Sequence, residues 1–359
     1  MNKNIKVQRN IIKAIIALIV LIIALIIAYS LYQKDNDNSI KAYSESGFFY
    51  DTFIEITVYS NNEEGAKTAL NIIMDQCSDY EMLFSKTLVG SEIYKLNTER
   101  DVIVSSTTSL LLNYCVSMYY ITNGYFDIST GTYLEGFDTE TCSIYDEETV
   151  SELLEVVDID NLCLNTDDDG VCYASLIDDV TTIDLGGAAK GFIADRISNY
   201  LKSSGFTDFI INLGGNLLVS GYKNSENGNV YSLGIQKPFD SLGSVMLSIS
   251  GTDMSVVTSG IYERYFVSGD KIYHHIFDPF TGYPVENNLY SVTIIGEESF
   301  MCDCFSTAVF VMGLTEGMEF INDYDGYEAV FIDDQYNVYV SDGLVYNEED
   351  ASITIKTTD

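Results

Sequence analysis

Two short segments of the sequence carry residue types that could do chemistry together. The segment MCDCFST at residues 301–307 places Asp303 and Thr307 four positions apart, on one face if the segment is helical. A carboxylate and a hydroxyl are oxygen ligands that suit a hard cation. The segment DLGGAAKG at residues 184–191 joins a glycine pair, which lets backbone approach a ligand closely, to Lys190, which can meet a phosphate. These segments predict a metal-assisted site for a phosphorylated ligand.

The chain has two histidines, His274 and His275, and two of its three prolines lie in the turn that follows them. Neighbours on a strand point to opposite faces, so at most one histidine enters a given site. Structural roles explain several of these residues equally well. A strand histidine before a turn needs no function, Asp184 could cap a helix, and Lys190 could be a solvated helical lysine.

One acidic segment fits half of a calcium loop. The letters NTDDDG at residues 165–170 match its start, but Leu176 stands at the twelfth position, where a bidentate glutamate belongs. A hairpin with an Asp-Gly turn explains the same letters more simply. The Gly-Gly-Ala-Ala-Lys-Gly segment also lacks the spacing of a P-loop.

The N-terminal segment predicts a membrane anchor. Residues 14–32 contain no charged side chain. A helix of this length is about long enough to cross the hydrocarbon core of a bilayer. Four basic residues and no acidic residue precede this run, so we expect residues 1–13 in the cytoplasm. A linker at 33–46 and an extracytoplasmic domain at 47–359 would follow, giving a single-pass protein of the cell membrane. A cleaved signal peptide is the alternative, although no clear small-x-small cleavage site follows the run.

The charge of the remaining chain restricts its partners. Five of the 18 basic residues lie in the first 34 positions, which leaves 13 against all 54 acidic residues, a net charge of 13 − 54 = −41. So acidic a body excludes a nucleic-acid partner, and an anionic ligand would need a metal or local cations. The seven cysteines show no disulfide framework, and we expect Cys302 and Cys304 to pack around Asp303.

Hydrophobic periodicity predicts an α+β fold of mostly antiparallel sheets flanked by helices. We expect helices at residues 61–84, 106–122, 188–202 and 301–312, with Gly313 ending the last one. We expect strands at 53–59, 329–332 and 338–340, and several short strands between 209 and 295.

Seven segments in order along the chain resemble the motifs of the ApbE-type flavin transferases, the FAD:protein FMN transferases. They are SEIYKLN (91–97), GYFD (124–127), DLGGAAKGFIAD (184–195), NLGG (212–215), VTSGIYERY (257–265), HHIFDPFTG (274–282) and DCFSTA (303–308). The resemblance extends from about residue 49 to residue 340. It implies an ApbE-like α+β domain.

The resemblance also implies a reaction. Members bind FAD and Mg²⁺, transfer FMN to a Thr or Ser hydroxyl of an exported acceptor protein, and release AMP. Candidate acceptors are exported FMN-binding domains of sodium-pumping or Rnf-type redox complexes, or extracellular electron-transfer proteins. Two alternatives stay open: an Mg²⁺-dependent FAD pyrophosphatase that gives FMN and AMP, and a non-catalytic FAD-binding surface protein.

Carried over position by position, the resemblance assigns roles to residues of this chain. Asp303, Thr307 and a backbone carbonyl near Gly187 match the metal ligands, with Ala188 or Ala189 as other sources of that carbonyl. His275 is the candidate general base, since a free imidazole titrates near neutral pH, with Asp278 as a possible orienting group. The resemblance thus makes Asp303 and His275 the candidate catalytic residues. The positions that match the FAD site are Tyr50, Tyr125, Phe126, Asp127, Asp184, Lys190, Ser259, Gly260 and His275.

Three places in the sequence, two single residues and one short segment, depart from the family pattern. Phe280 stands where the Asp-Pro-Arg-Thr-Gly turn commonly has arginine, and Asn216 replaces a frequent aspartate after a glycine pair. Tyr50, Asp51 and Thr52 replace Met-Gly-Thr, so the flavin ring would stack on a tyrosine. None of these changes touches the proposed metal ligands.

Overall fold

The computed structural model describes residues 13, 15, 16, 18–27, 39–223, 227–241, 243–350 and 354–356. Within the predicted anchor, the described part contains an apolar helix at Leu18–Ile27 with exposed side chains. Positions 14, 17 and 28–32 of the anchor, nearly all of residues 1–13 and positions 33–38 of the linker lie outside the described residues. Among the described helices, only Ser299–Asn322 is long and apolar enough to span a membrane, and it is largely buried within the domain.

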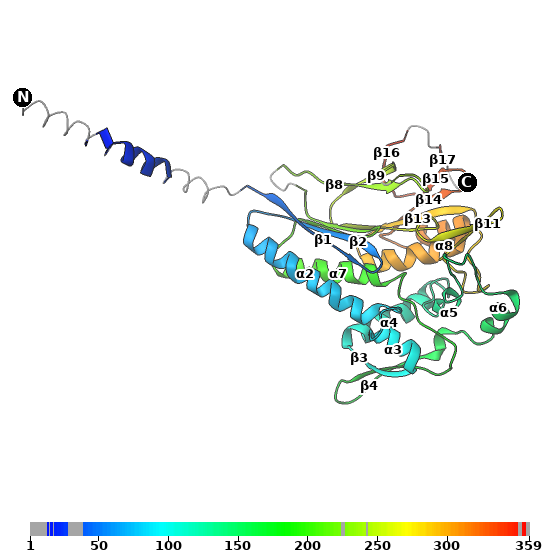
Figure 1. Cartoon of the computed structure of the whole chain (residues 1–359). Coiled ribbons are helices and arrows are strands. Elements are labelled where there is room, and N and C mark those ends of the chain that lie inside the picture. Colours follow the sequence, from blue (N-terminus) through cyan, green and yellow to red (C-terminus); the bar gives the residue numbers. More distant parts are fainter. Residues whose placement is uncertain are drawn as a thin grey trace, which may run out of the picture.

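Nine strands form the main sheet of the domain (Figure 1). In spatial order they are β1 (Lys41–Phe49), β2 (Thr52–Ser60), β6 (Phe209–Leu213), β7 (Asn216–Ser220), β10 (Met254–Gly260), β13 (Leu289–Gly296), β14 (Glu328–Asp333), β15 (Asn337–Val340) and β17 (Thr354–Lys356). All neighbours are antiparallel except β15 and β17. This confirms the predicted α+β class with mostly antiparallel sheets.

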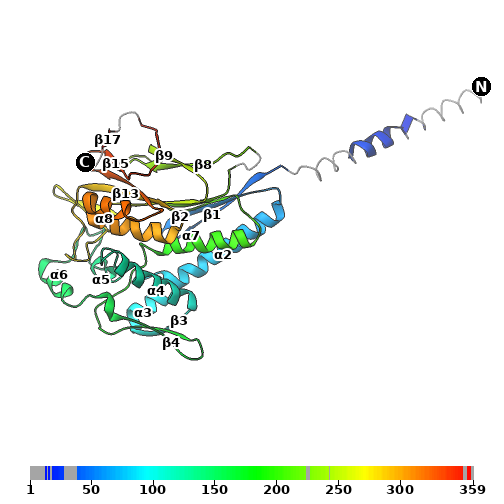
Figure 2. The ribbon, with the colours of Figure 1, turned by 180° about the vertical axis from the view of Figure 1, so that it is seen from behind.

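The main sheet lies between a layer of helices and a smaller sheet (Figures 1 and 2). The helices on one face are α2 (Glu63–Phe84), α7 (Ala189–Ser203) and α8 (Ser299–Asn322). The smaller sheet on the other face contains β8 (Tyr231–Gln236), β9 (Val245–Gly251) and β16 (Asn347–Glu348). Alternate residues of β2, Ile54, Ile56 and Val58, are fully buried and belong to the larger apolar cluster, as the period of a strand requires.

A second group of elements lies on the side of the helical layer that faces away from the main sheet (Figure 1). It comprises α3 (Glu92–Glu99), α4 (Ser106–Ile121), α5 (Gly131–Leu134), α6 (Glu147–Leu154), the 3-10 turn at Ile159–Asn161, and the sheet of β3 (Asp101–Val104), β5 (Cys172–Leu176) and β4 (Leu162–Thr166). A separate hairpin pairs β11 (Tyr265–Ser268) with β12 (Lys271–His274).

The acidic segment at 165–170 forms the turn between β4 and β5. The Asp167 carboxylate accepts the amides of Asp169 at 3.0 Å and Val171 at 2.8 Å, and Gly170 has φ 82°. The hairpin interpretation is therefore confirmed, since this carboxylate is engaged by its own turn.

Helices α7 and α8 cap each other's N-termini. Neither helix has a side-chain cap of its own, since the residues before their first turns are Ala188 and Glu298 without a capping bond. Asp303 of α8 accepts the Gly191 amide of α7 at 2.8 Å. Asp195 of α7 accepts the amides of Ser299 at 3.0 Å and Phe300 at 2.8 Å. Carboxylates thus satisfy amides that a helix start leaves unpaired, and the pairing requires the helices to run antiparallel.

Two glycines shape this helix pair. A Cβ atom on Gly191 would lie 2.4 Å from the Ser299 carbonyl oxygen and 2.8 Å from the Cβ of Asp303, so only glycine allows this close helix contact. Gly313 interrupts α8 with φ 80° and ψ −177°. The predicted stop at Gly313 is thus a real break, but the chain resumes a helix that continues to Asn322.

We predict that Asp195→Ala lowers the free energy of unfolding by about 1–3 kcal/mol, because two helix-start amides lose their acceptor. Urea denaturation of the full chain measures this loss. Asp146→Ala is the matched control, since Asp146 caps the peripheral α6 through Thr149 alone, and it should cost less. Equal stability of the Asp195→Ala variant and the parent would contradict the capping role.

Candidate active site

Asp303, Thr307 and Gly187 meet where α7 begins. Asp303 is 3% exposed, and burial raises the pKa of its carboxyl, although Lys190 and the Gly191 amide oppose that effect. One turn later on α8, Thr307 is partly exposed. A Cβ atom on Gly187 would lie 2.9 Å from the Thr307 Oγ1, so the main chain passes directly beside this hydroxyl. The helical spacing predicted for Asp303 and Thr307 is therefore present.

The end of β10 adds a further hydroxyl to this group. Ser259 shares a hydrogen bond of 2.8 Å with Ser306 and lies 3.4 Å from the Thr307 Oγ1. Ser306 donates to the Asp303 carbonyl at 2.9 Å. Gly260 follows Ser259 as the last residue of β10 and has the Tyr262 ring directly beside it. The sequence indicated Ser259 and Gly260, but Ser306 was not singled out.

Lys190 is the cation whose charge lowers the pKa of Asp303. Its Nζ donates to the Gly186 carbonyl at 3.1 Å, which folds the side chain back over the glycine turn. Its charge lowers the pKa values of Asp303, His275 and Glu263. Desolvation raises the pKa of Glu263 to about 7, with Lys190 opposing and Asp303 adding to the rise. Glu263 was missed by sequence reasoning, although it lies within the segment VTSGIYERY.

Asp184 forms an ion pair at the edge of the site. Its Oδ2 lies 2.7 Å from the Lys86 Nζ, and its Oδ1 accepts the Gly186 amide at 2.7 Å. Burial alone would raise the pKa of Asp184, but Lys86, the Gly186 amide and Arg264 together lower it. Asp184 is therefore a charged anchor for the glycine turn. Lys86 lies in the loop after α2, and no sequence pattern marked it.

The two histidines have different environments, as the strand argument required. His274 is buried, and its Nε2 lies 3.0 Å from the Val285 carbonyl oxygen. His275 is partly buried, and its Nδ1 lies 3.2 Å from the Arg264 carbonyl oxygen, which leaves Nε2 without a bond to any described residue. Desolvation, with the charges of Arg264, His274 and Lys190, lowers the pKa of His275 to about 4. The imidazole is neutral at pH 7, with Nδ1–H donating to the carbonyl and Nε2 able to accept a proton.

Asp278 does not provide the orienting contact considered for His275. Its Oδ1 accepts the Phe280 amide at 2.8 Å within the turn. The Arg264 carbonyl is the group that holds the His275 ring, so the orienting role belongs to the main chain between β10 and β11.

The segment at 124–127 reaches the site through one of its residues. The Phe126 ring would lie 3.4 Å from a Cβ atom on Gly187, so it packs under the glycine turn. Tyr125 donates to Glu316 at 2.9 Å and packs against Phe280 with ring centroids 5.1 Å apart. The Asp127 carboxylate accepts the amide and hydroxyl of Ser129, and desolvation raises its pKa to about 6. Tyr125 and Asp127 thus have local partners, and their roles stay predictions.

Tyr50 lies in the tight turn between β1 and β2. Its hydroxyl donates to the Cys77 carbonyl at 2.7 Å, and its amide donates to Glu81 at 2.8 Å. Desolvation, together with Cys77 and Glu81, raises the pKa of the Tyr50 phenol well above its ordinary value. The side chain is held against α2, and no hydrogen bond or ion pair joins it to Asp303 or Lys190.

Asn216, the second departure from the family pattern, has a structural role. It is buried in β7, and its Oδ1 accepts the Ser299 hydroxyl at 2.8 Å. It therefore fixes the first residue of α8.

The donor set at the start of α7 fits a hard divalent cation. Asp303 supplies a buried carboxylate, Thr307 a hydroxyl, and the adjacent Gly187 segment supplies main-chain oxygens. Within the described part of the chain, no lysine or arginine forms an ion pair with Asp303, and no three His, Cys, Asp or Glu side chains gather as a metal cluster. Binding there would rely on one carboxylate with hydroxyl and carbonyl oxygens.

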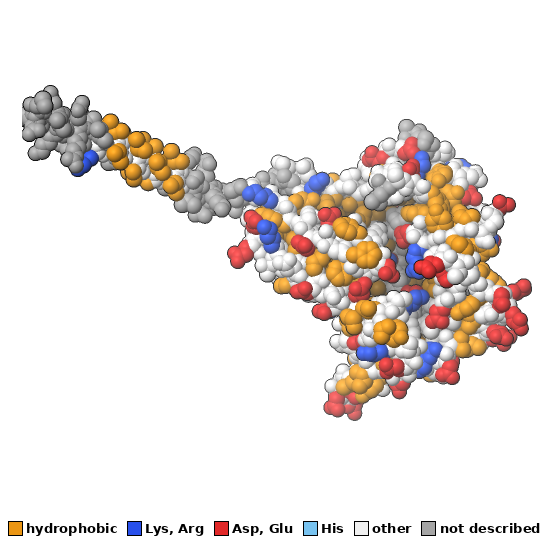
Figure 3. Space-filling model, viewed as in Figure 1, with side chains coloured by type: hydrophobic (Ala, Val, Ile, Leu, Met, Phe, Trp, Pro, Cys, Tyr) orange, Lys and Arg blue, Asp and Glu red, His pale blue; other side chains and the backbone are white. Residues whose placement is uncertain are grey.

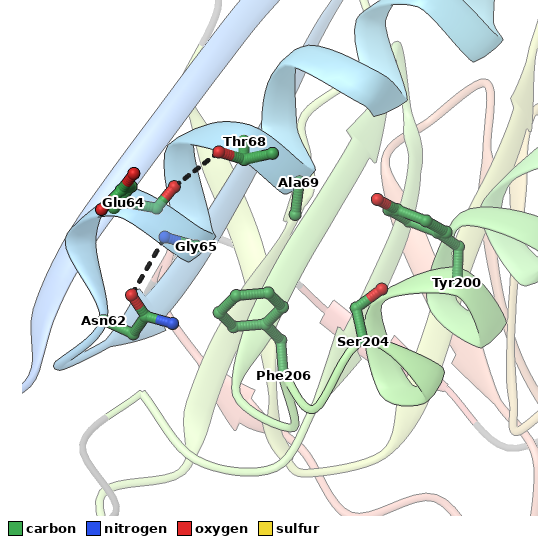
Figure 4. Close-up of a pocket in the computed structure, with 8 residues that line it drawn as sticks. All are labelled: Asn62, Glu64, Gly65, Thr68, Ala69, Tyr200, Ser204 and Phe206. Atoms are coloured by element: carbon green, nitrogen blue, oxygen red, sulfur yellow. Dashed lines mark hydrogen bonds between the residues drawn. The ribbon is translucent and has the colours of Figure 1, made fainter.

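Figure 3 shows a hollow in the surface between the α2 side and the α8 side, with basic and acidic side chains at its rim. A separate hollow of about 430 Å³ lies between the start of α2 and the end of α7 (Figure 4). Its lining comprises Asn62, Glu64, Gly65, Thr68, Ala69, Tyr200, Ser204 and Phe206, none of which belongs to the group around Asp303.

Comparison with known proteins identifies relatives of the whole domain. The sequence model of the ApbE family matches residues 50–331. An FAD:protein FMN transferase of Klebsiella pneumoniae is 29% identical over 313 residues, which cover 85% of this chain and 93% of that protein. The corresponding protein of Treponema pallidum is 28% identical over 325 residues, covering 85% and 88%. The crystal structure of the ApbE protein from Thermotoga maritima superposes with a TM-score of 0.75 at 29% identity, covering 84% of this chain and 97% of that one.

We predict that Lys86→Met lowers the free energy of unfolding by about 1–2 kcal/mol at pH 7, because the partly buried Asp184 loses its counter-ion. The pKa of Asp184 is lowered in the folded state, so its contribution is full above its ordinary value of 3.8 and is lost as the pH falls through the folded value. The difference between the variant and the parent should therefore shrink in acid. Urea denaturation across pH measures it.

Lys67→Met is the control, because the pair of Lys67 with Glu63 is 62% and 61% exposed and should contribute little. An equal effect of the two substitutions would contradict the role of Lys86.

Proposed function

The chain belongs to the ApbE family, and from this premise we propose that it transfers FMN from FAD to a Thr or Ser hydroxyl of an exported acceptor protein, releasing AMP. Relatives that align over most of the chain are named FAD:protein FMN transferases. The observation that carries the proposal is the contact of α7 with α8. It gathers Asp303, Thr307, the Gly187 main chain and Lys190 at one point.

Electrostatics supports a bound diphosphate at this point. The body of the protein has a net charge of −41, which repels an anionic ligand. Lys190, Arg264 and Lys86 are three of only 13 basic residues outside the N-terminal segment. The charge of each affects the pKa of a residue of this site, His275 or Asp184. Such a local concentration of cations in an acidic protein favours an anion-binding role.

Asp303 and Thr307 would hold Mg²⁺ together with a main-chain carbonyl, that of Gly187, Ala188 or Ala189. A divalent cation there supplies charge neutralisation for the diphosphate and makes the phosphorus of the FMN moiety more electrophilic. The Asp303 carboxylate already accepts the Gly191 amide, so its orientation is fixed before any ligand binds.

His275 would take the proton in the transfer. The acceptor oxygen forms a bond to the phosphorus of the FMN moiety, and the bond from that phosphorus to the bridging oxygen breaks. The AMP phosphate leaves with the electron pair. Nε2 of His275 accepts the hydroxyl proton, because Nδ1 is engaged with the Arg264 carbonyl and desolvation keeps the ring neutral. Binding an anion beside Arg264 and Lys190 should raise the pKa of His275 and strengthen it as a base.

To modify an exported acceptor protein, the catalytic domain must itself lie outside the cell. The charge-free run at 14–32 and the basic residues before it support an uncleaved anchor with the catalytic domain outside the cell. The apolar helix at Leu18–Ile27 is consistent with this topology.

The full chain, mixed with FAD, Mg²⁺ and the purified FMN-acceptor domain of an Rnf-type redox complex, should add an FMN phosphoester to one acceptor threonine or serine. Mass spectrometry of the acceptor measures the adduct, and a parallel reaction without acceptor measures hydrolysis of FAD. Bound FAD without any adduct would contradict the transfer reaction. FMN and AMP formed without acceptor would instead indicate a pyrophosphatase.

Asp303→Asn should reduce adduct formation on the order of 100-fold or more, because the charge that would hold Mg²⁺ is gone. Mg²⁺ should also cease to tighten FAD binding, measured by flavin fluorescence. Asp146→Asn, at the distant α6 cap, should behave like the parent. An Asp303→Asn variant with full turnover would remove the metal assignment.

His275→Gln should lower the rate of adduct formation by roughly 100-fold, because the variant lacks the proton acceptor. FAD affinity should stay within a few-fold of the parent, since the substitution preserves a polar side chain of similar reach. A large loss of FAD affinity at an unchanged rate would show that His275 binds FAD and is not the base.

A further inference from the structure

Among the described residues, no strand lies beside one long edge of the main sheet. β1 is the outermost strand, and its neighbour among the described residues is β2 alone. Its nine residues pair with β2 in unbroken register, without a bulge and without proline, and its last four residues carry no charge. The opposite edge strand, β17, is only three residues long and ends in a lysine. Native proteins normally protect a long edge against pairing, and β1 lacks such protection near its C-terminal end.

The turn after β1 determines which backbone groups face this edge. Tyr50 and Asp51 have φ of 55° and 58°, as a two-residue turn of type I′ requires. A hairpin of this kind closes on a hydrogen-bonded pair, here Phe49 with Thr52, and bonded and non-bonded pairs then alternate. The Tyr59 amide fits this pattern, because it donates away from β1, to the Asp208 carbonyl at 2.8 Å.

Ser44, Ser46 and Phe48 consequently belong to non-hydrogen-bonded pairs with β2. Their N–H and C=O groups point outward, and within the described chain none of these amides has an acceptor. The free edge therefore offers alternating donors and acceptors that an added strand could use.

Two aromatic side chains flank this edge on the sheet face away from α2. Phe48 and Phe53 are 70% and 60% exposed, and they lie directly opposite each other in the register. Side chains are closest in non-hydrogen-bonded pairs, so Phe48 and Phe53 offer neighbouring apolar surface on this face. A residue of an added strand opposite Phe48 would pack on this surface.

The edge is continuous with the candidate active site. Thr52 follows the turn, and a Cβ atom on Gly214 would lie 2.1 Å from its Oγ1. A Cβ atom on the next residue, Gly215, would lie 3.6 Å from Glu263 Oε1. The charges of Lys190 and Asp303 both affect the pKa of Glu263. The C-terminal end of β1 is thus connected through one glycine turn to the residues around Asp303.

We propose that an extended segment of the acceptor protein adds to β1 as a tenth strand, with an apolar side chain on Phe48 and Phe53, and delivers its hydroxyl past the Tyr50 turn. The inference rests on the proposed function, because that reaction requires a protein segment to enter the site. A peptide strand fits this edge better than a lipid surface does, since a strand can pair with the outward amides and carbonyls, whereas hydrocarbon would leave them unpaired.

Ser46→Pro tests the strand addition. Proline removes an outward N–H without breaking a bond to β2 and is tolerated on an edge, whereas Ser46→Ala keeps the N–H. The probe is the same purified FMN-acceptor domain, and its dissociation constant is measured on the full chain in the presence of FAD and Mg²⁺. We expect Ser46→Pro to weaken binding about tenfold, the cost of one lost hydrogen bond, while Ser46→Ala binds like the parent.

A double variant, Phe48→Ser with Phe53→Ser, should also weaken acceptor binding while FAD affinity stays unchanged. Ile177→Ser is the control, because Ile177 is 68% exposed outside the main sheet. The binding comparison decides the inference even if the parent makes no adduct, a result that would count against the proposed function. Equal binding by all variants, or no acceptor binding by the parent, would overturn it. So would an edge-to-edge dimer of the chain that Ser46→Pro dissolves while flavinylation stays unchanged.

Discussion

The arrangement of the whole site depends on two carboxylates that cap each other's helices. Asp303 of α8 accepts an amide at the start of α7, and Asp195 of α7 accepts two amides at the start of α8. These contacts fix the register of the two helices, and Gly191 allows the close approach that they need. Asp303 therefore has a structural role, and the chemical role that we propose for it would use the same carboxylate in the orientation that this contact fixes.

Charge explains why such a construction is useful in this protein. Burial disfavours the ionised form of Asp303, so a nearby cation is needed to stabilise it. Lys190 contributes part of that charge, and a divalent cation would contribute the rest. The strongly acidic body repels an anionic dinucleotide everywhere else, so selective binding requires the cations to be concentrated at one place. Lys86, Lys190 and Arg264 provide that concentration, with Asp184 orienting the glycine turn between them.

Much of the fold and part of the site could be predicted from the sequence. The helices α2, α4 and α7 begin and end within a few residues of their predicted bounds, whereas α8 continues to Asn322, past the predicted stop at Gly313. Asp303 and Thr307 could be paired because helical spacing is local. Lys86, Glu263 and the Arg264 carbonyl could not be found in this way, because tertiary packing alone brings them to the site. The short α3 and α6 were also missed, since eight residues make only about two helical turns, fewer than a pattern needs to be told from a strand or loop.

The proposed function depends on metal binding at Asp303. The most direct test is anomalous diffraction from crystals of the chain soaked with Mn²⁺ and FAD. We expect one anomalous peak within ligand distance of the Asp303 carboxylate and the Thr307 hydroxyl, beside the main chain of Gly187. A peak at another place, or a diphosphate bound here without any metal, would contradict it.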